Sequence, residues 1–217
     1  MKPEERRARV LVLASGNGGN FEALARAAKS GEAPIDMVGL VGDRPAAPCF
    51  ERARRLGIET LALPVEGRTR QEYDARLAEA AEGFSPDWIL LLGWMRILSK
   101  AFLGRFPGRV INLHPALPGR FPGTEAIRRA WDAARAGQGD RTGVMLHHVP
   151  DEGVDTGPPI LVREVEIGSE ESLDSLESRM HLAEHELVIE LAKRLRRDRI
   201  YDQAATTRPG ESQGGTT

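Results

Sequence analysis

An asparagine and a histidine stand two residues apart in the segment 110–123, VINLHPALPGRFPG. The apolar pair that opens it predicts a buried strand leading into Asn112 and His114, and Pro115 ends regular pairing because it has no N–H. Residues i and i+2 of a strand point to the same side. A donating amide and an imidazole that titrates near neutrality could together stabilise a carbonyl under attack. The alternative is a strand end capped by a satisfied asparagine and histidine.

A glycine-rich segment, SGNGGN at residues 15–20, lies between an expected strand and an expected helix. Glycines let the backbone approach a ligand closely, and a helix start presents unpaired N–H groups. The segment is not the dinucleotide fingerprint, which needs a glycine where Phe21 stands, nor a Walker loop, which needs Lys followed by Ser or Thr. The spacing therefore favours a phosphate site over the alternative, a tight turn without a ligand.

A third candidate is Asp155, which lies in the glycine- and proline-rich loop 153–159, GVDTGPP. A carboxylate near His114 would favour the imidazolium form and raise the pKa of that histidine. The alternative is a turn aspartate that hydrogen-bonds its own backbone. The sequence alone does not tell which way Asp155 faces.

The last expected helix, residues 173–195, carries a carboxylate in its apolar arc. Its stripe consists of Leu173, Leu176, Met180, Ala183, Leu187 and Leu191. At about 100° per residue, Glu184 falls about 40° from the middle of this stripe, whereas His185 points away toward solvent. A buried carboxylate needs a partner, which is either an internal arginine or a ligand donor.

Alternating strands and helices would bring these segments together. Expected strands are 9–14, 35–41, 58–63, 88–92 and 110–114, with further extended segments at 142–149 and 159–167. Expected helices are 21–31, 49–57, 69–83, 99–105, 124–136 and 173–195. This order predicts an α/β fold with an open, mostly parallel sheet and helices on both faces. The last two strands lack a helix between them, which predicts a mixed or antiparallel edge. Chemistry is then expected beyond the carboxyl ends of the strands.

The composition excludes several classes of protein. Among 217 residues, 30 Lys and Arg oppose 32 Asp and Glu, so no charge excess favours nucleic acid or membrane. The single cysteine excludes an internal disulfide, and no cluster of His, Cys or Asp has metal-ligand spacing. No apolar run approaches the length of about 18 residues that a membrane span needs. We expect no secretory signal, because the charged N-terminal segment lacks an apolar region. We expect a cytoplasmic protein with one catalytic domain, residues 1–200, and a disordered polar tail, residues 201–217.

Four segments match one family in order: SGNGGN, MRIL at residues 95–98, INLHPALP, and VDTGP followed by a helix that carries AEH. The chain resembles the glycinamide ribonucleotide transformylases, which are folate-dependent formyltransferases, over about residues 9–195. Each motif is modest alone, but the four in register are specific. The resemblance implies a Rossmann-like fold and transfer of a formyl group from 10-formyltetrahydrofolate to the amine of glycinamide ribonucleotide in purine biosynthesis.

The resemblance also implies roles for single residues. Asn112, His114 and Asp155 match the catalytic trio. The residues that would bind the ribonucleotide are Asn17, Gly18, Gly19, Asn20 and Glu184. Folate binding falls to Arg70, Met95, Arg96, Ile97, Leu98 and Asn112, and the loop around 150–155 would hold the pterin-like ring. The implied partners are these two small molecules, with no metal, nucleic acid or membrane, and the protein would be a monomer or a homodimer.

The implied mechanism is direct transfer without a covalent enzyme intermediate. The acceptor amine attacks the formyl carbon, and Asn112 and protonated His114 donate hydrogen bonds to the oxyanion that forms. Asp155 keeps His114 charged and orders a water that carries the proton from the amine to the leaving nitrogen.

The sequence departs from the family pattern at three places. Gly19 stands where serine is common, and Pro118 comes one place early in the loop after His114. The segment 147–155 is one residue longer than usual, so either His147 or His148 could occupy the family's histidine position.

Rival functions differ from this expectation in domain content, in substrate or in turnover. A methionyl-tRNA formyltransferase would carry a C-terminal RNA-binding domain, and a formyltetrahydrofolate deformylase an N-terminal regulatory domain. A sugar-nucleotide N-formyltransferase also binds a phosphate-bearing acceptor. From another class, a non-catalytic nucleotide- or folate-binding protein would show the same loops without turnover.

Overall fold

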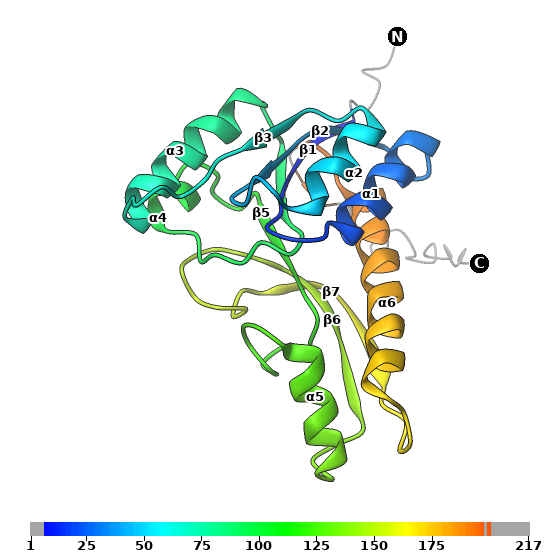
Figure 1. Ribbon diagram of the computed structural model, residues 1–217. Coiled ribbons are helices and arrows are strands. Elements are labelled where there is room, and N and C mark those ends of the chain that lie inside the picture. Colours follow the sequence, from blue (N-terminus) through cyan, green and yellow to red (C-terminus); the bar gives the residue numbers. More distant parts are fainter. Residues whose placement is uncertain (1–6, 198, 201–217) are drawn as a thin grey trace, which may run out of the picture.

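The computed structural model describes residues 7–197 and 199–200 (Figure 1), so the expected tail at 201–217 lies outside the described residues. Within these ranges one sheet has the strand order β3-β2-β1-β4-β5-β6-β7. The strands are β1 Ala8–Leu13, β2 Ile35–Gly42, β3 Thr60–Ala62, β4 Trp88–Leu91, β5 Val110–His114, β6 Arg141–His148 and β7 Pro159–Glu166. Strands β1 to β5 pair in parallel, whereas β6 is antiparallel to both β5 and β7. The predicted antiparallel edge is confirmed.

The helices are α1 Gly19–Ser30, α2 Pro48–Leu56, α3 Arg70–Gly83, α4 Lys100–Leu103, α5 Ala126–Arg135 and α6 Leu173–Arg194. Some helix ends fall at residues that favour them, as at the left-handed Gly31 and Gly57 that follow α1 and α2. The expected capping box is present, because Glu72 N donates to Thr69 Oγ1 (3.3 Å) and Thr69 N to Glu72 Oε2 (2.9 Å). Helix α5 starts two residues later than expected, because Glu125 has a left-handed backbone with φ of 55°.

Alternate residues of the strands pack on opposite faces of the sheet, as their period of two requires. In β1, Val10 and Val12 join the core beneath α1, α2, α5 and α6. Leu11 and Leu13 join the core beneath α3 and α4. Figure 1 shows the strands between these two groups of helices, so the prediction that helices cover both faces is confirmed.

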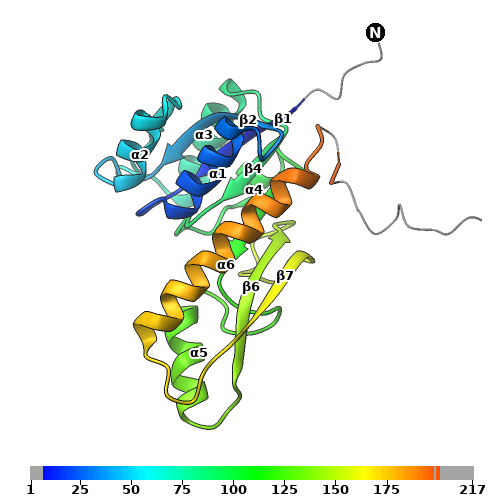
Figure 2. The ribbon, with the colours of Figure 1, turned by 90° about the vertical axis from the view of Figure 1, so that its right-hand side faces the viewer.

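The order of strands reverses direction between β1 and β4, which creates a crevice at their carboxyl ends. Backbone hydrogen bonds link the segments that follow these two strands: Ser15 N donates to Gly93 O at 3.0 Å. Met95 N donates to Ser15 Oγ, also at 3.0 Å. The long helix α6 runs beside α1 (Figure 2), and its side chains line one side of this crevice. Within the described residues, no helix is both long and apolar enough to cross a bilayer.

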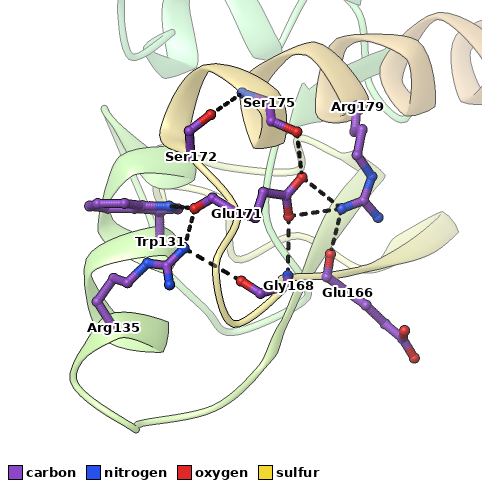
Figure 3. Close-up of polar contacts among 8 residues, drawn as sticks. All are labelled: Trp131, Arg135, Glu166, Gly168, Glu171, Ser172, Ser175 and Arg179. Carbon is purple, nitrogen blue, oxygen red and sulfur yellow. Dashed lines mark hydrogen bonds and ion pairs between the residues drawn. The ribbon is translucent and has the colours of Figure 1, made fainter.

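At the far end of the molecule, Glu171 ties α5, the end of β7 and the start of α6 together (Figure 3). Its carboxylate accepts hydrogen bonds from Arg179 Nη1 (2.9 and 3.0 Å), Ser175 Oγ (2.9 Å) and Gly168 N (3.1 Å). Its carbonyl accepts from Trp131 Nε1 at 2.8 Å. Burial raises the pKa of Glu171, but these hydrogen bonds outweigh it and leave the pKa lowered.

Glu171→Gln should therefore destabilise the fold without changing the activity per folded molecule. We expect a loss of about 1–2 kcal/mol in the free energy of unfolding, since Arg179 is 47% exposed and its ion pair is screened. The wild-type contribution is present above the unfolded pKa and is lost as pH falls through the lowered folded pKa. Urea unfolding at pH 7 measures the loss, with exposed Glu170→Gln as the matched control. Equal stability of the two variants would contradict the assignment.

Candidate active site

A cleft of about 1170 Å³ opens beyond the carboxyl ends of β1, β4 and β5, and α6 forms part of its wall. Nearly all the predicted site residues line it: Asn17, Gly18, Gly19, Asn20, Met95, Arg96, Ile97, Leu98, Asn112, His114, Asp155 and Glu184. Arg70 is the exception. A single drug-sized ligand typically occupies a pocket of about 300–1,000 Å³, so this cleft has room for two substrates.

The glycine-rich loop at one end of the cleft is held in place by α2. Gly18 has φ of 78°, and a Cβ there would lie 2.6 Å from the Cβ of Cys49, so only glycine fits. Arg52 binds both oxygens of Asn17, with Nε 2.8 Å from the carbonyl oxygen and Nη2 2.9 Å from Oδ1. Arg52 also pairs with Glu22. The loop is therefore preformed, with the first N–H groups of α1 beside the cleft.

Glu184 faces this loop from α6 and is 6% exposed. Its Oε2 accepts a hydrogen bond from Asn20 Nδ2 at 2.9 Å, and burial raises the pKa of its carboxyl. The predicted burial is confirmed, and the partner is an amide rather than an arginine. The expectation that His185 points into solvent is wrong. His185 is half-buried and lines the cleft, because α6 packs against α1, and its Nε2 lies 3.5 Å from where a Gly19 Cβ would be.

The other end of the cleft brings together the three residues of the expected trio. Asp155 Oδ2 lies 3.3 Å from His114 Nδ1, and Oδ1 accepts from Asn112 Nδ2 at 3.0 Å. Gly123 N donates to Oδ2 at 2.8 Å, while His114 Nε2 lies 3.1 Å from Phe121 O. Asp155 thus faces His114, and each nitrogen of the imidazole meets an acceptor.

His147 is a fourth member of this group that sequence reasoning left undecided. Its Nε2 lies 3.1 Å from Asn112 Nδ2, and its Nδ1 lies 2.8 Å from His148 O. Nδ1 therefore donates to that carbonyl, and Nε2 lies between the Asn112 amide and Asp155 Oδ1, which is 3.5 Å away. His147 lines the cleft and His148 does not. The signal that could have found it is register, because Asn112 pairs with His147 across β5 and β6.

The electrostatic balance at His114 differs from the expectation. Burial lowers the pKa of His114, and the Asp155 carboxylate and the Phe121 carbonyl only partly oppose this effect. The expected net rise in pKa is therefore wrong, because the side chain is just 4% exposed. Burial raises the pKa of Asp155, but its hydrogen bonds and the neighbouring histidines leave it lowered. The lowered pKa of Asp155 keeps its side chain a carboxylate at pH 7.

Between the two ends, the segment after β4 gives the cleft an apolar wall. Met95 is 57% and Ile97 45% exposed, which is unusual for side chains of this kind and fits a wall that contacts a ligand. Arg96 lies over the Tyr73 ring at 5.0 Å from its centroid.

Arg70 lies outside the wall but connects to it through the loop 150–155. It pairs with Glu152, whose Oε1 also accepts from Lys100 N at 3.0 Å. No group of three or more His, Cys, Asp or Glu within residues 7–197 and 199–200 is arranged to hold a metal ion.

Comparison with known proteins finds relatives over most of the chain. Residues 8–192 match the formyl transferase family. A phosphoribosylglycinamide formyltransferase of Schizosaccharomyces pombe is 39% identical over 198 residues, covering 84% of this chain and 94% of that protein. One of Dictyostelium discoideum is 36% identical over 200 residues, covering 86% and 97%. The crystal structure of glycinamide ribonucleotide transformylase 1 from Symbiobacterium toebii superimposes with a TM-score of 0.83 at 32% identity, covering 93% of this chain and 98% of that one.

Proposed function

The chain belongs to the formyl transferase family, and from this premise we propose that it is a phosphoribosylglycinamide formyltransferase. It transfers the formyl group of 10-formyltetrahydrofolate to the amine of glycinamide ribonucleotide in de novo purine (IMP) biosynthesis. The main support is a single cleft that has the preformed glycine-rich loop, suited to an anion, at one end and Asn112, Asp155 and His114 at the other. An acceptor bound by its phosphate at the loop would extend its amine toward that group.

The acceptor's phosphate binds the N–H groups of residues 17–20 at the start of α1, where the helix dipole also favours an anion. The Glu184 carboxylate accepts hydrogen bonds from N–H or O–H groups of the ribonucleotide substrate. Support comes from its burial within the cleft wall with Asn20 Nδ2 as its hydrogen-bond donor. A buried carboxylate with so few hydrogen-bond donors lowers the stability of the fold. It is stabilised most when a bound ligand supplies further donors.

Glu184→Gln should weaken acceptor binding by about tenfold, because an amide is a poorer acceptor than a carboxylate and one charge-assisted hydrogen bond contributes roughly 1.5–3 kcal/mol. The unliganded protein should be as stable as the wild type or slightly more stable, since a buried carboxyl has been replaced by a neutral amide. Calorimetric titration with the acceptor and thermal unfolding with and without it measure both effects. The control is Glu177→Gln, two turns earlier on α6 and outside the cleft. Lost stability with unchanged acceptor affinity would mean that Glu184 serves the fold.

The folate donor supplies the formyl group. It binds in the part of the cleft that lies away from the glycine-rich loop. The exposed apolar side chains of Met95 and Ile97 offer a surface for its rings, and the buried Leu98 and residues of the loop 150–155 also line the cleft. Arg96 and Arg70 supply positive charge for the donor's carboxylates. Asn112 stands where the donor and the acceptor amine meet.

Asn112 and His114 hold the oxygen of the transferred group while it carries negative charge. In the unliganded site the Asn112 amide nitrogen donates to Asp155 and lies beside His147 Nε2, so it has to exchange one of these contacts for the oxygen. Burial disfavours the charged form of His114, and negative charge developing beside the ring raises its proton affinity. Asp155 favours that protonation and orients a water that moves the amine proton.

Turnover separates this proposal from its rivals. Difference absorbance of the folate, with glycinamide ribonucleotide as acceptor, is expected to show transfer. Turnover with an amino-sugar nucleotide instead would make the chain a sugar-nucleotide N-formyltransferase, and formate release without any acceptor a deformylase. Binding of both ligands without turnover would make it a non-catalytic binding protein.

The remaining expectations are part of the same proposal. The substrates are small molecules and not nucleic acid, no metal takes part, and the protein acts in the cytoplasm as a monomer or a homodimer. Residues 1–200 form the catalytic domain. Size-exclusion chromatography with light scattering tests the oligomeric state.

A further inference from the structure

The loop between β5 and α5 has an unusual backbone. Phe121 has φ of 45°, Gly123 82° and Glu125 55°, so three of five successive residues lie in the left-handed region. Side chains other than glycine adopt this region at a cost in conformational free energy. Such a loop keeps its shape only when neighbouring groups hold it.

The same loop contacts the catalytic group through its main chain. The carbonyl of Phe121 lies 3.1 Å from His114 Nε2, and the N–H of Gly123 donates to Asp155 Oδ2 at 2.8 Å. The positions of both side chains therefore depend on the path of the backbone from Phe121 to Gly123. No side chain of the loop has to touch the substrate for the loop to affect the reaction.

Arg129, in the first turn of α5, hydrogen-bonds this backbone from outside the cleft. Its Nη1 donates to Pro122 O at 2.7 Å and to Thr124 O at 3.3 Å, one residue on each side of Gly123. Its guanidinium carbon lies 5.7 Å from the centroid of the Phe121 ring, and Arg120 lies 5.3 Å from the same centroid. Arg129 thus contacts three of the four residues from Phe121 to Thr124.

We infer that Arg129 is a positioning residue: it fixes the loop 121–124 so that Phe121 O and Gly123 N–H hold His114 and Asp155 in their reactive arrangement. It does not touch the substrates, because it is exposed on α5 and is not part of the cleft wall. The inference rests on the proposed function only in its kinetic part, since the contacts with the histidine and the aspartate exist without substrate.

The next arginine provides a matched control. Arg128 is exposed on the same turn of α5 and lies outside the cleft wall. Arg128→Ala removes the same charge from the same helix as Arg129→Ala does, without removing the hydrogen bonds to Pro122 and Thr124. Arg129→Lys keeps the charge and a group that donates hydrogen bonds, but places a compact ammonium where the planar guanidinium stands.

Kinetics of the whole chain with both substrates give the first readout. We expect Arg129→Ala to lower kcat by about tenfold with both KM values within twofold, because a misplaced catalytic group can cost on the order of a hundredfold and the loop keeps its other contacts. Arg129→Lys should recover part of the loss, and Arg128→Ala should match the wild type. Equal kcat in Arg129→Ala and Arg128→Ala would overturn the inference.

NMR titration of His114 gives a second readout that needs no turnover. The groups that face this ring are Asp155, His147 and the backbone of Phe121 and Arg120. Looser contact with the Phe121 carbonyl removes a group that favours the imidazolium, so the His114 titration should shift to lower pH in Arg129→Ala and not in Arg128→Ala. If the wild type fails to use glycinamide ribonucleotide, the proposed function fails. If the titration curves of the two alanine variants coincide, the positioning role fails.

Discussion

Asp155→Asn is expected to lower kcat by about a hundred- to a thousandfold, the range measured when an oxyanion donor is lost. The carboxylate accepts from Asn112 Nδ2 and Gly123 N and lies beside His114 Nδ1, whereas an amide has one oxygen and brings its own N–H groups. In the variant an amide N–H group therefore faces one of the groups that donate to the wild-type carboxylate. The negative charge that favours a protonated His114 is also gone. The loss should appear in kcat and kcat/KM together, because these interactions strengthen in the transition state.

The same variant should change how the protein responds to acid. Because the folded pKa of His114 is already lowered, the unfolded chain binds a proton more readily, and stability falls as pH drops below the unfolded value of about 6.5. Without the Asp155 carboxylate the folded pKa of His114 drops further, so this loss extends to lower pH. The lowered pKa of Asp155 also stabilises the wild type above its unfolded value, and the variant lacks this contribution.

NMR titration of His114 in the wild type and in Asp155→Asn measures this change, and steady-state kinetics measure the loss of rate. Asp140→Asn, an exposed position at the start of the antiparallel edge, is the control for loss of a carboxylate elsewhere. Coincident titration curves would show that Asp155 is not the electrostatic partner of His114, whatever the kinetics.

Local rules of the chain were sufficient to predict most of the fold. Period-two apolar strands, Pro48 and Thr69 at helix starts, and the missing helix between the last two strands each determine structure within a few residues. The candidate site followed from one further rule, that parallel strands end at the same edge of a sheet.

What the sequence did not predict depends on contacts between distant segments. The pKa of His114 falls because the ring is buried in the assembled site, and no local pattern near His114 encodes that burial. His147 joins the group through the register of β5 with β6, and Asn20 meets Glu184 because α1 packs against α6. Arg129 contacts a loop with three left-handed residues, and no local pattern in the sequence indicates this backbone path.

Gly19→Asp is expected to raise the KM for the acceptor by about a hundredfold and to leave the folate KM unchanged. Gly19 is the first residue of α1, and its φ is not in the left-handed region, so an aspartate can adopt its backbone. A Cβ there would meet only His185 Nε2, at 3.5 Å. The unliganded fold should even gain slightly, because an acidic residue in the first turn suits the helix dipole.

The loss comes from charge alone. A carboxylate about 5 Å from a phosphate dianion, at an effective dielectric constant of about 40, repels it by about 3 kcal/mol, which corresponds to a factor on the order of a hundred. Gly19→Ser adds bulk and a hydroxyl without charge and should bind the acceptor as the wild type does. Because exposed charges are screened, added salt should reduce the difference between the two variants. Acceptor and folate KM values for both variants decide the matter: a rise confined to the folate KM would place the phosphate elsewhere than at residues 17–20, and the two substrates would then lie in the cleft the other way round.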